Sequence, residues 1–201
     1  MKVVIVTGGI GSGKSVVCRY LHSEYGWPVY EADARVKQLY QEHPTLLSDI
    51  EESLGLSLRD RSGIFVPQLL AGVIFSDTKA LAKVEELVFP VLTEDFIQWK
   101  SAHSDCRFGI LESATILEKP KLAGMGDVAV LIDAPVDIRA ERAAARSRVS
   151  KESVFKRMES QPYMNDISNG VAESEVDFVI MNTGSVAELE EKIDDLVGKM
   201  L

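Results

Sequence analysis

The chain has 201 residues, of which 46% are hydrophobic and 26% are charged, and its formal net charge is −9. This length and composition suit a globular protein with a sizeable buried core and exclude a disordered chain. The acidic balance argues against a nucleic-acid surface spread over the protein. No apolar run approaches the roughly 18 residues of a membrane helix, and the two cysteines lack metal-ligand spacing. We therefore expect a cytoplasmic protein with free thiols and with neither a membrane nor a nucleic-acid partner.

The first third of the chain predicts two strands followed by a long helical stretch. Residues 2–7 form a short, β-branched apolar run that is typical of a strand buried on both faces. A glycine loop follows, then a helical pattern at 16–25 and a second short strand at 27–30. Helical patterns dominate from about 34 to 102, with breaks near Pro44, at Gly55 and around 61–63. This stretch is too long for a crossover, so we expect an insertion over the carboxyl ends of the strands, where ligands bind in open α/β sheets.

The remainder of the chain alternates strands with helices. Strands are predicted at 108–111, 128–132 and 176–181, and helices at 136–146, 151–160 and 186–200. Such alternation indicates parallel β-α-β units. The predicted fold class is therefore α/β, with a five-stranded parallel sheet covered by helices.

The glycine loop at residues 8–15 matches the pattern G-x-x-x-x-G-K-[ST] in full. Its glycines permit the positive backbone angles that turn successive N–H groups inward around a phosphate. Lys14 would place an ammonium against the outer phosphates, and Ser15 would offer a hydroxyl to Mg²⁺. We therefore predict ATP and Mg²⁺ as cofactors, with Ser15 as the metal ligand and Lys14 as a catalytic residue. The predicted nucleotide-binding residues of this segment are Gly8, Gly9, Gly11, Ser12, Gly13, Lys14, Ser15 and Val16.

Other segments separate the classes of P-loop protein. The guanine-reading Asn-Lys-x-Asp segment of switch GTPases is absent from the sequence. Asp133 is followed by Ala134, whereas motor and AAA-type ATPases usually carry Asp-Glu at the end of a strand. The small-molecule kinases remain, which combine an N-terminal P-loop with an acid after the second strand and an arginine-rich lid.

Asp33 is the candidate acid. It is predicted to end the second strand, 18 residues after Ser15, at the same sheet edge as the phosphates. A carboxylate there could accept the proton of an acceptor hydroxyl or orient that hydroxyl for in-line attack. The alternative is a helix N-cap, and both roles can coexist.

A basic segment lies late in the chain, with seven basic residues against two acids between Arg139 and Arg157. Arg139, Arg142 and Arg146 are spaced to share one helix face. Guanidinium groups neutralise the charge that spreads over a transferred phosphoryl group, and a closing lid excludes water. Arg142 is therefore predicted to be catalytic and Arg146 to bind ATP. A solvated helix face is the alternative interpretation.

Several blocks of the chain, in order, resemble the dephospho-coenzyme A kinase family. They are residues 7–15, 31–33 and 111–118, then Arg142, Arg146, Arg157 and Gln161, and finally residues 177–184. The resemblance implies a three-layer P-loop NTPase fold that phosphorylates the 3′-hydroxyl of dephospho-coenzyme A with ATP, the last step of coenzyme A synthesis. It also implies that Asn182, in the closing block, belongs to the ATP site.

The resemblance further implies a division of the single P-loop kinase domain. The core would comprise about 1–34, 103–138 and 174–201, the helical acceptor-binding insertion about 35–102, and a short helical lid about 139–173. Phe89, Glu112 and Ser147 depart from the family pattern, which usually has His, Asp and Asp there. Two other interpretations stay open: a kinase for another small acceptor, such as a nucleotide or sugar acid, and a nucleotide-binding module without turnover.

Overall fold

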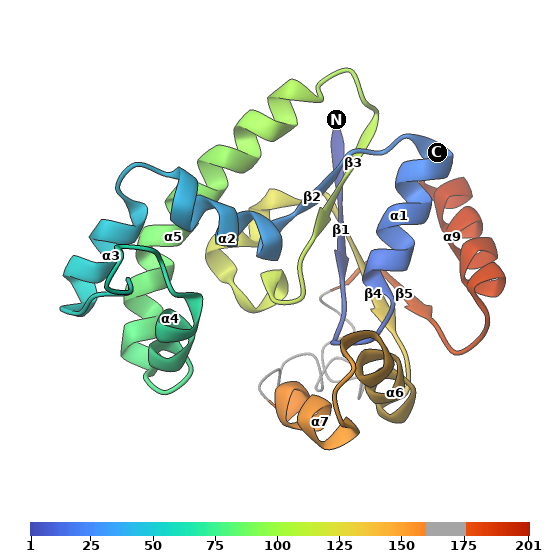
Figure 1. Cartoon of the computed structure of the whole chain (residues 1–201). Coiled ribbons are helices and arrows are strands. Elements are labelled where there is room, and N and C mark those ends of the chain that lie inside the picture. Colours follow the sequence, from blue (N-terminus) through green and yellow to red (C-terminus); the bar gives the residue numbers. More distant parts are fainter. Residues whose placement is uncertain (160–175) are drawn as a thin grey trace. The chain divides into compact units, whose positions relative to one another are not determined.

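The structure is a computed structural model that describes residues 1–159 and 176–201 (Figure 1). The chain divides into two compact units, Met1–Glu31 with Ala102–Leu201, and Ala32–Ser101. Gln161 and the part of the predicted lid from 160 to 173 lie outside the described residues. Within the described ranges, no helix has both the length and the apolar character needed to cross a membrane.

The first unit is built on a parallel sheet. Its strands are β1 (Lys2–Thr7), β2 (Val29–Glu31), β3 (Phe108–Glu112), β4 (Val128–Asp133) and β5 (Phe178–Met181). Their order is β2-β3-β1-β4-β5, and every neighbouring pair is parallel. The expected α/β fold with a five-stranded parallel sheet is confirmed. The second strand begins two residues later than predicted, at Val29. The N–H and carbonyl of Trp27 bond to Leu21 and His22 at the end of α1, and Pro28 has no N–H to donate to the ladder.

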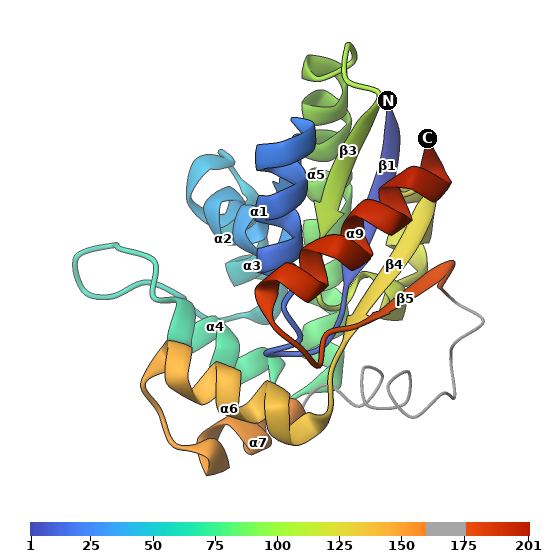
Figure 2. The same cartoon turned by 90° about the vertical axis from the view of Figure 1, so that its right-hand side faces the viewer.

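Two helices cover one face of this sheet, α1 (Lys14–Tyr25) and α9 (Val186–Met200), which lie side by side (Figure 2). The apolar side chains of Val4 and Val6, on β1, belong to the main hydrophobic core. Val3 and Ile5, whose side chains alternate with these, are also buried. The strand is therefore buried on both faces, as its continuous apolar run predicts.

Two further helices, α6 (Val136–Ser147) and α7 (Lys151–Glu159), lie beyond the carboxyl ends of the strands (Figure 1). Ala140 and Ala143 of α6 pack against Val154 and Met158 of α7, and Ile10 of the glycine loop packs against this cluster. Two short 3-10 helices, η1 (Ile116–Glu118) and η2 (Pro120–Met125), connect β3 to β4. The glycine loop is thus in contact with α6 and α7 as well as with its own strand and helix.

The second unit is helical. Its helices are α2 (Ala32–Glu42), α3 (Leu46–Leu54), α4 (Pro67–Ile74) and α5 (Thr78–Ala102). Breaks fall near Pro44, at Gly55 and around 61–63 as predicted, and a further break between Ile74 and Thr78 was not predicted. Gly55 ends α3 in the left-handed conformation, with φ of 66°.

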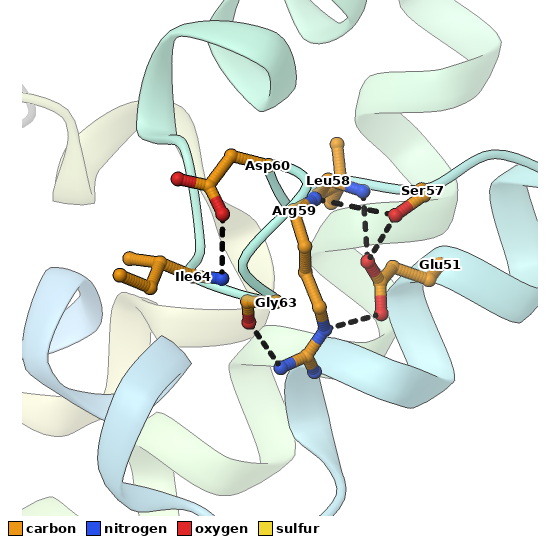
Figure 3. A network of polar contacts seen from close by, with 7 residues as sticks. All are labelled: Glu51, Ser57, Leu58, Arg59, Asp60, Gly63 and Ile64. Atoms are coloured by element: carbon orange, nitrogen blue, oxygen red, sulfur yellow. Dashed lines mark hydrogen bonds and ion pairs between the residues drawn. The ribbon is translucent and has the colours of Figure 1, made fainter.

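The α3–α4 connection is held by a polar network around Glu51 (Figure 3). Its carboxylate accepts the Leu58 N–H at 2.7 Å and Arg59 Nε at 3.1 Å. Asp60 accepts the Ile64 N–H at 3.0 Å, which closes the turn. Burial alone would raise the pKa of Glu51, but these donors outweigh it, and the pKa lies below its usual value.

Candidate active site

The glycine loop joins β1, which ends at Thr7, to α1, which begins at Lys14. Gly8, Gly11 and Gly13 have φ of 145°, 78° and 111°, a region that side-chain-bearing residues rarely adopt. A side chain on Gly13 would also collide with the amide of Asn182. The loop therefore has the backbone geometry of an anion nest followed by the positive end of a helix.

Lys14 is folded back over this loop. Its Nζ donates to the carbonyl of Gly8 at 2.7 Å and lies 3.7 Å from Oε1 of Glu112. Both side chains are largely buried, with 12% and 14% exposure. The parallel register pairs Val6 with Glu112, which brings the carboxylate to the edge of the sheet where β1 enters the loop. Lys14 thus has a counter-ion in the free protein, and its flexible stem can turn the ammonium toward a phosphate.

Two carboxylates stand at neighbouring strand ends, since the register pairs Glu31 of β2 with Glu112 of β3. Their field reaches Cys18 on the buried face of α1. Burial in the first place, and then these two carboxylates, raise the pKa of the Cys18 thiol well above its usual value. The thiol is therefore protonated and unreactive, as expected for a free cysteine in the core.

Ser15 is exposed in the first turn of α1, next to the loop. Within the described residues, no three His, Cys, Asp or Glu side chains gather as a metal site. This arrangement fits Mg²⁺, which keeps several waters and takes only one or two protein ligands beside substrate phosphates.

Asn182 follows β5 and reaches the glycine loop. Its Nδ2 donates to the carbonyl of Ser12 at 2.8 Å, and the residue is 6% exposed. The predicted site residue is therefore beside the loop, where its amide holds the loop backbone. The sequence places these residues 170 positions apart, so no local signal predicts this bond.

The three arginines of α6 have different surroundings. Arg142 donates from Nη1 to the carbonyl of Asn182 at 2.9 Å and from Nη2 to that of Gly184 at 3.4 Å. Arg146 is exposed, and Arg139 is buried under the loop. The spacing predicts one shared face but not this division, because burial depends on what α6 packs against.

Asp33 lies in the first turn of α2, since β2 ends at Glu31 and the helix begins at Ala32. The prediction that Asp33 ends the strand is wrong by two residues: the strand passes into the helix without a loop. A carboxylate in the first turn stabilises a helix by interacting favourably with the helix dipole. Asp33 belongs to the second unit, and its part in the chemistry stays a prediction.

Two charged residues at the site are not among the predicted site residues. The sequence marks Glu112 only as a departure from the family pattern, and its ion pair with Lys14 follows from the β1–β3 register. Arg139 is predicted only as one of three arginines on one helix face. Its burial follows from the packing of α6, which no local pattern predicts.

A nucleotide loop between the central strand and its helix, with arginines on α6 beside it, defines this chain as a P-loop kinase of small molecules. Within that class the family follows from comparison with known sequences. The family model described as dephospho-CoA kinase matches residues 2–188, and the chain belongs to this family.

Individual relatives agree with this assignment. A dephospho-CoA kinase of Porphyromonas gingivalis is 36% identical over 184 residues, which cover 90% of this chain and 86% of that protein. Among solved structures, TT1252 of Thermus thermophilus has a TM-score of 0.82 at 26% identity, covering 100% of this chain and 98% of that one. A dephospho-CoA kinase from Campylobacter jejuni has a TM-score of 0.68 at 21% identity over the same shares, a likeness of fold alone.

Proposed function

We propose that this chain transfers the terminal phosphoryl group of ATP to the 3′-hydroxyl of dephospho-coenzyme A, giving coenzyme A and ADP in the last step of coenzyme A biosynthesis. The observation that carries the proposal is a complete P-loop, with Lys14 folded over it, in a member of the dephospho-CoA kinase family. We further propose a cytoplasmic location, as expected from the lack of a membrane-length apolar run in the sequence.

The proposed ATP site consists of the glycine loop and the residues around it. The loop amides and the N-terminus of α1 would bind the phosphates, and Lys14 would exchange Glu112 for the outer phosphates. Arg146 and Asn182 would complete the nucleotide site. Arg142 would neutralise charge on the transferred group after releasing its carbonyl partners.

Ser15 is the residue proposed to hold Mg²⁺, which when bound would offset the negative charge of the phosphate oxygens. The exposed hydroxyl in the first turn of α1 supports this role.

Asp33 is the proposed base or orienting group for the acceptor. The 3′-hydroxyl oxygen forms a bond to the γ-phosphorus while the bond from that phosphorus to the bridging oxygen of ADP breaks. The hydroxyl proton passes to the Asp33 carboxylate and from there to solvent. Residues of about 35–102 would bind the acceptor, and α6 with α7 would form the described part of the lid.

A coupled assay of ADP release with dephospho-coenzyme A tests the proposal, run on the wild type, Asp33→Asn and Lys14→Ala. Asp33→Asn should lower kcat by about 100-fold or more with ATP affinity retained, because general bases contribute about 10²–10⁴-fold. Lys14→Ala should weaken ATP binding as well.

A panel of nucleotide and sugar-acid acceptors is the control for substrate identity. ADP release with one of these acceptors, and none above background with dephospho-coenzyme A, would assign another substrate. Tight ATP binding with no product from any acceptor would show a module without turnover.

A further inference from the structure

Arg139 is a buried cation, and two of its guanidinium nitrogens have no hydrogen-bond partner among the described residues. It lies in the first turns of α6 and is 1% exposed. Its Nε and Nη2 are buried and have no hydrogen-bond partner among the described residues. A guanidinium carries five N–H donors, and leaving buried donors unpaired disfavours the folded state. Such a residue is stabilised by a compensating group, which the described residues supply only in part, through the field of Asp133.

The same arginine supports the first half of the glycine loop from behind. A side chain on Gly9 would collide with Nη1 and Cζ of Arg139, so the guanidinium lies directly against the Gly9 backbone. A side chain on Gly11 would collide with the carbonyl of Arg139 itself. Both the backbone and the side chain of Arg139 therefore contact the loop, and the two glycines are what permit this approach.

Two hydroxyl groups of the loop region also lack hydrogen-bond partners among the described residues. Thr7 Oγ1 and Ser12 Oγ are buried without a hydrogen-bond partner among the described residues. A Cβ on Gly8 would lie 2.8 Å from Ser12 Oγ, which places this hydroxyl at the start of the loop. Unpaired polar atoms thus gather around the segment that is shaped to receive an anion.

The charge of Arg139 is only partly balanced. Burial lowers the pKa of its guanidinium, and the field of Asp133 at the end of β4 opposes that shift. Asp133 is also buried, at 6% exposure. Arginine keeps its proton in proteins, so a positive charge remains behind the loop. In a low-dielectric interior such a charge attracts an anion near the loop more strongly than it would in water.

We propose that Arg139 is a positioning residue of the nucleotide site: it fixes the first half of the loop through Gly9 and Gly11, and its buried positive charge favours phosphates in the loop. This inference rests on the proposed ATP site and assigns Arg139 a role separate from the lid roles of Arg142 and Arg146. It implies that the free protein tolerates an unfavourable buried cation that bound nucleotide compensates.

Arg139→Met tests this, because methionine keeps much of the apolar stem and removes the charge and the donors. The dissociation constant of MgATP and the thermal midpoint of the nucleotide-free protein are both measured. We expect ATP binding to weaken by about tenfold or more, which corresponds to the loss of one charge-assisted interaction. We expect the nucleotide-free midpoint to stay the same or rise, since the variant removes a buried, only partly balanced positive charge.

The opposite pattern overturns the inference: a lower nucleotide-free midpoint with ATP affinity within about twofold of the wild type would make Arg139 a structural residue only. If both quantities fall, Arg139→Lys decides. Recovery of ATP affinity by this variant supports the role of the charge, and no recovery overturns it. Arg107→Met is the matched control, because it removes an equal charge from an exposed arginine that bonds the chain terminus at Leu201.

Lys14→Ala in the same titration separates the two proposals. If it abolishes ATP binding and Arg139→Met does not weaken it, the inference on Arg139 fails alone. If Lys14→Ala leaves ATP binding intact, both the proposed function and the inference on Arg139 fail.

Discussion

Asn182 illustrates how single side chains from distant parts of the chain hold the glycine loop. Its amide is the donor to the Ser12 carbonyl, and its own carbonyl accepts from Arg142. The three residues link the loop, the end of β5 and helix α6. A loop that must bind phosphates gains from such support, since pre-organised donors do not have to be ordered on binding.

Asn182→Ala should therefore destabilise the protein and weaken ATP binding. The change leaves the buried Ser12 carbonyl without its donor, which costs about 1–3 kcal/mol of the free energy of unfolding. Urea unfolding and ATP titration measure the two effects. Asn182→Asp is the comparison: it keeps the shape but turns an oxygen toward the carbonyl, so we expect a larger loss. Unchanged stability in both variants would contradict the role of this bond.

Glu51 allows a test, at a single residue, of how the stability of the second unit depends on pH. Its pKa is lowered in the folded protein, so its stabilising contribution is present above the ordinary glutamate pKa of about 4.3. The contribution is lost as pH falls through the lower folded pKa. The thermal midpoint of the wild type should exceed that of Glu51→Gln at pH 7, and the gap should close below about pH 4. Glu52→Gln, on the same helix, is the control, and an equal gap at all pH values would refute the network's electrostatic role.

At the scale of elements, α1 and α9 are tied by a shared carboxylate. Tyr20 and Tyr25 of α1 donate to Oδ1 of Asp194 on α9 at 2.8 and 2.7 Å. The two rings also meet edge to face, with centroids 6.4 Å apart. These hydrogen bonds join two helices that are adjacent in space but far apart in the sequence. They therefore help to hold together the helical layer on one face of the sheet.

Alkaline pH should loosen this tie. The hydrogen bond to Asp194 raises the pKa of Tyr20 to about 12 and that of Tyr25 in the same direction. The contribution is fully present below the ordinary tyrosine pKa of about 10 and is lost as pH rises through the folded pKa. The thermal midpoint should therefore fall between pH 10 and 12 more steeply in the wild type than in a Tyr20→Phe, Tyr25→Phe double variant. Parallel curves would mean that the tie does not contribute.

At the scale of the whole molecule, ligand binding and stability are linked. A ligand that binds only the folded state stabilises it by about 2.7 kcal/mol at 100 times its dissociation constant. The residues proposed to bind ATP all belong to the first unit. MgATP should therefore raise the thermal midpoint of that unit.

Scanning calorimetry with and without MgATP measures this shift. If the two units unfold in separate transitions, ATP should move only that of the unit with the sheet. Lys14→Ala should lose most of the shift, whereas Lys100→Ala, in α5, should keep it. A shift of equal size in both variants would show that ATP acts elsewhere on the molecule.

Features that depend on neighbouring residues follow from the sequence alone. Helix α9 runs over Val186–Met200 as predicted at 186–200, because Ser185 and Glu188 form a local capping box at its start. The glycine loop was equally readable, since its function requires particular residue types at fixed spacing. The family, too, was recognisable from such blocks, and the comparison with known sequences confirmed it.

Contacts between residues distant in the chain follow from the tertiary structure. The Lys14–Glu112 pair, the bond from Asn182 to Ser12 and the burial of Arg139 beneath Gly9 all arise from strand order and helix placement. Hydrophobic periodicity states which face of an element is buried but not what will lie against it. The arginines of α6 therefore looked equivalent in the sequence and differ in the fold, because only the fold sets their distance from the loop and from water.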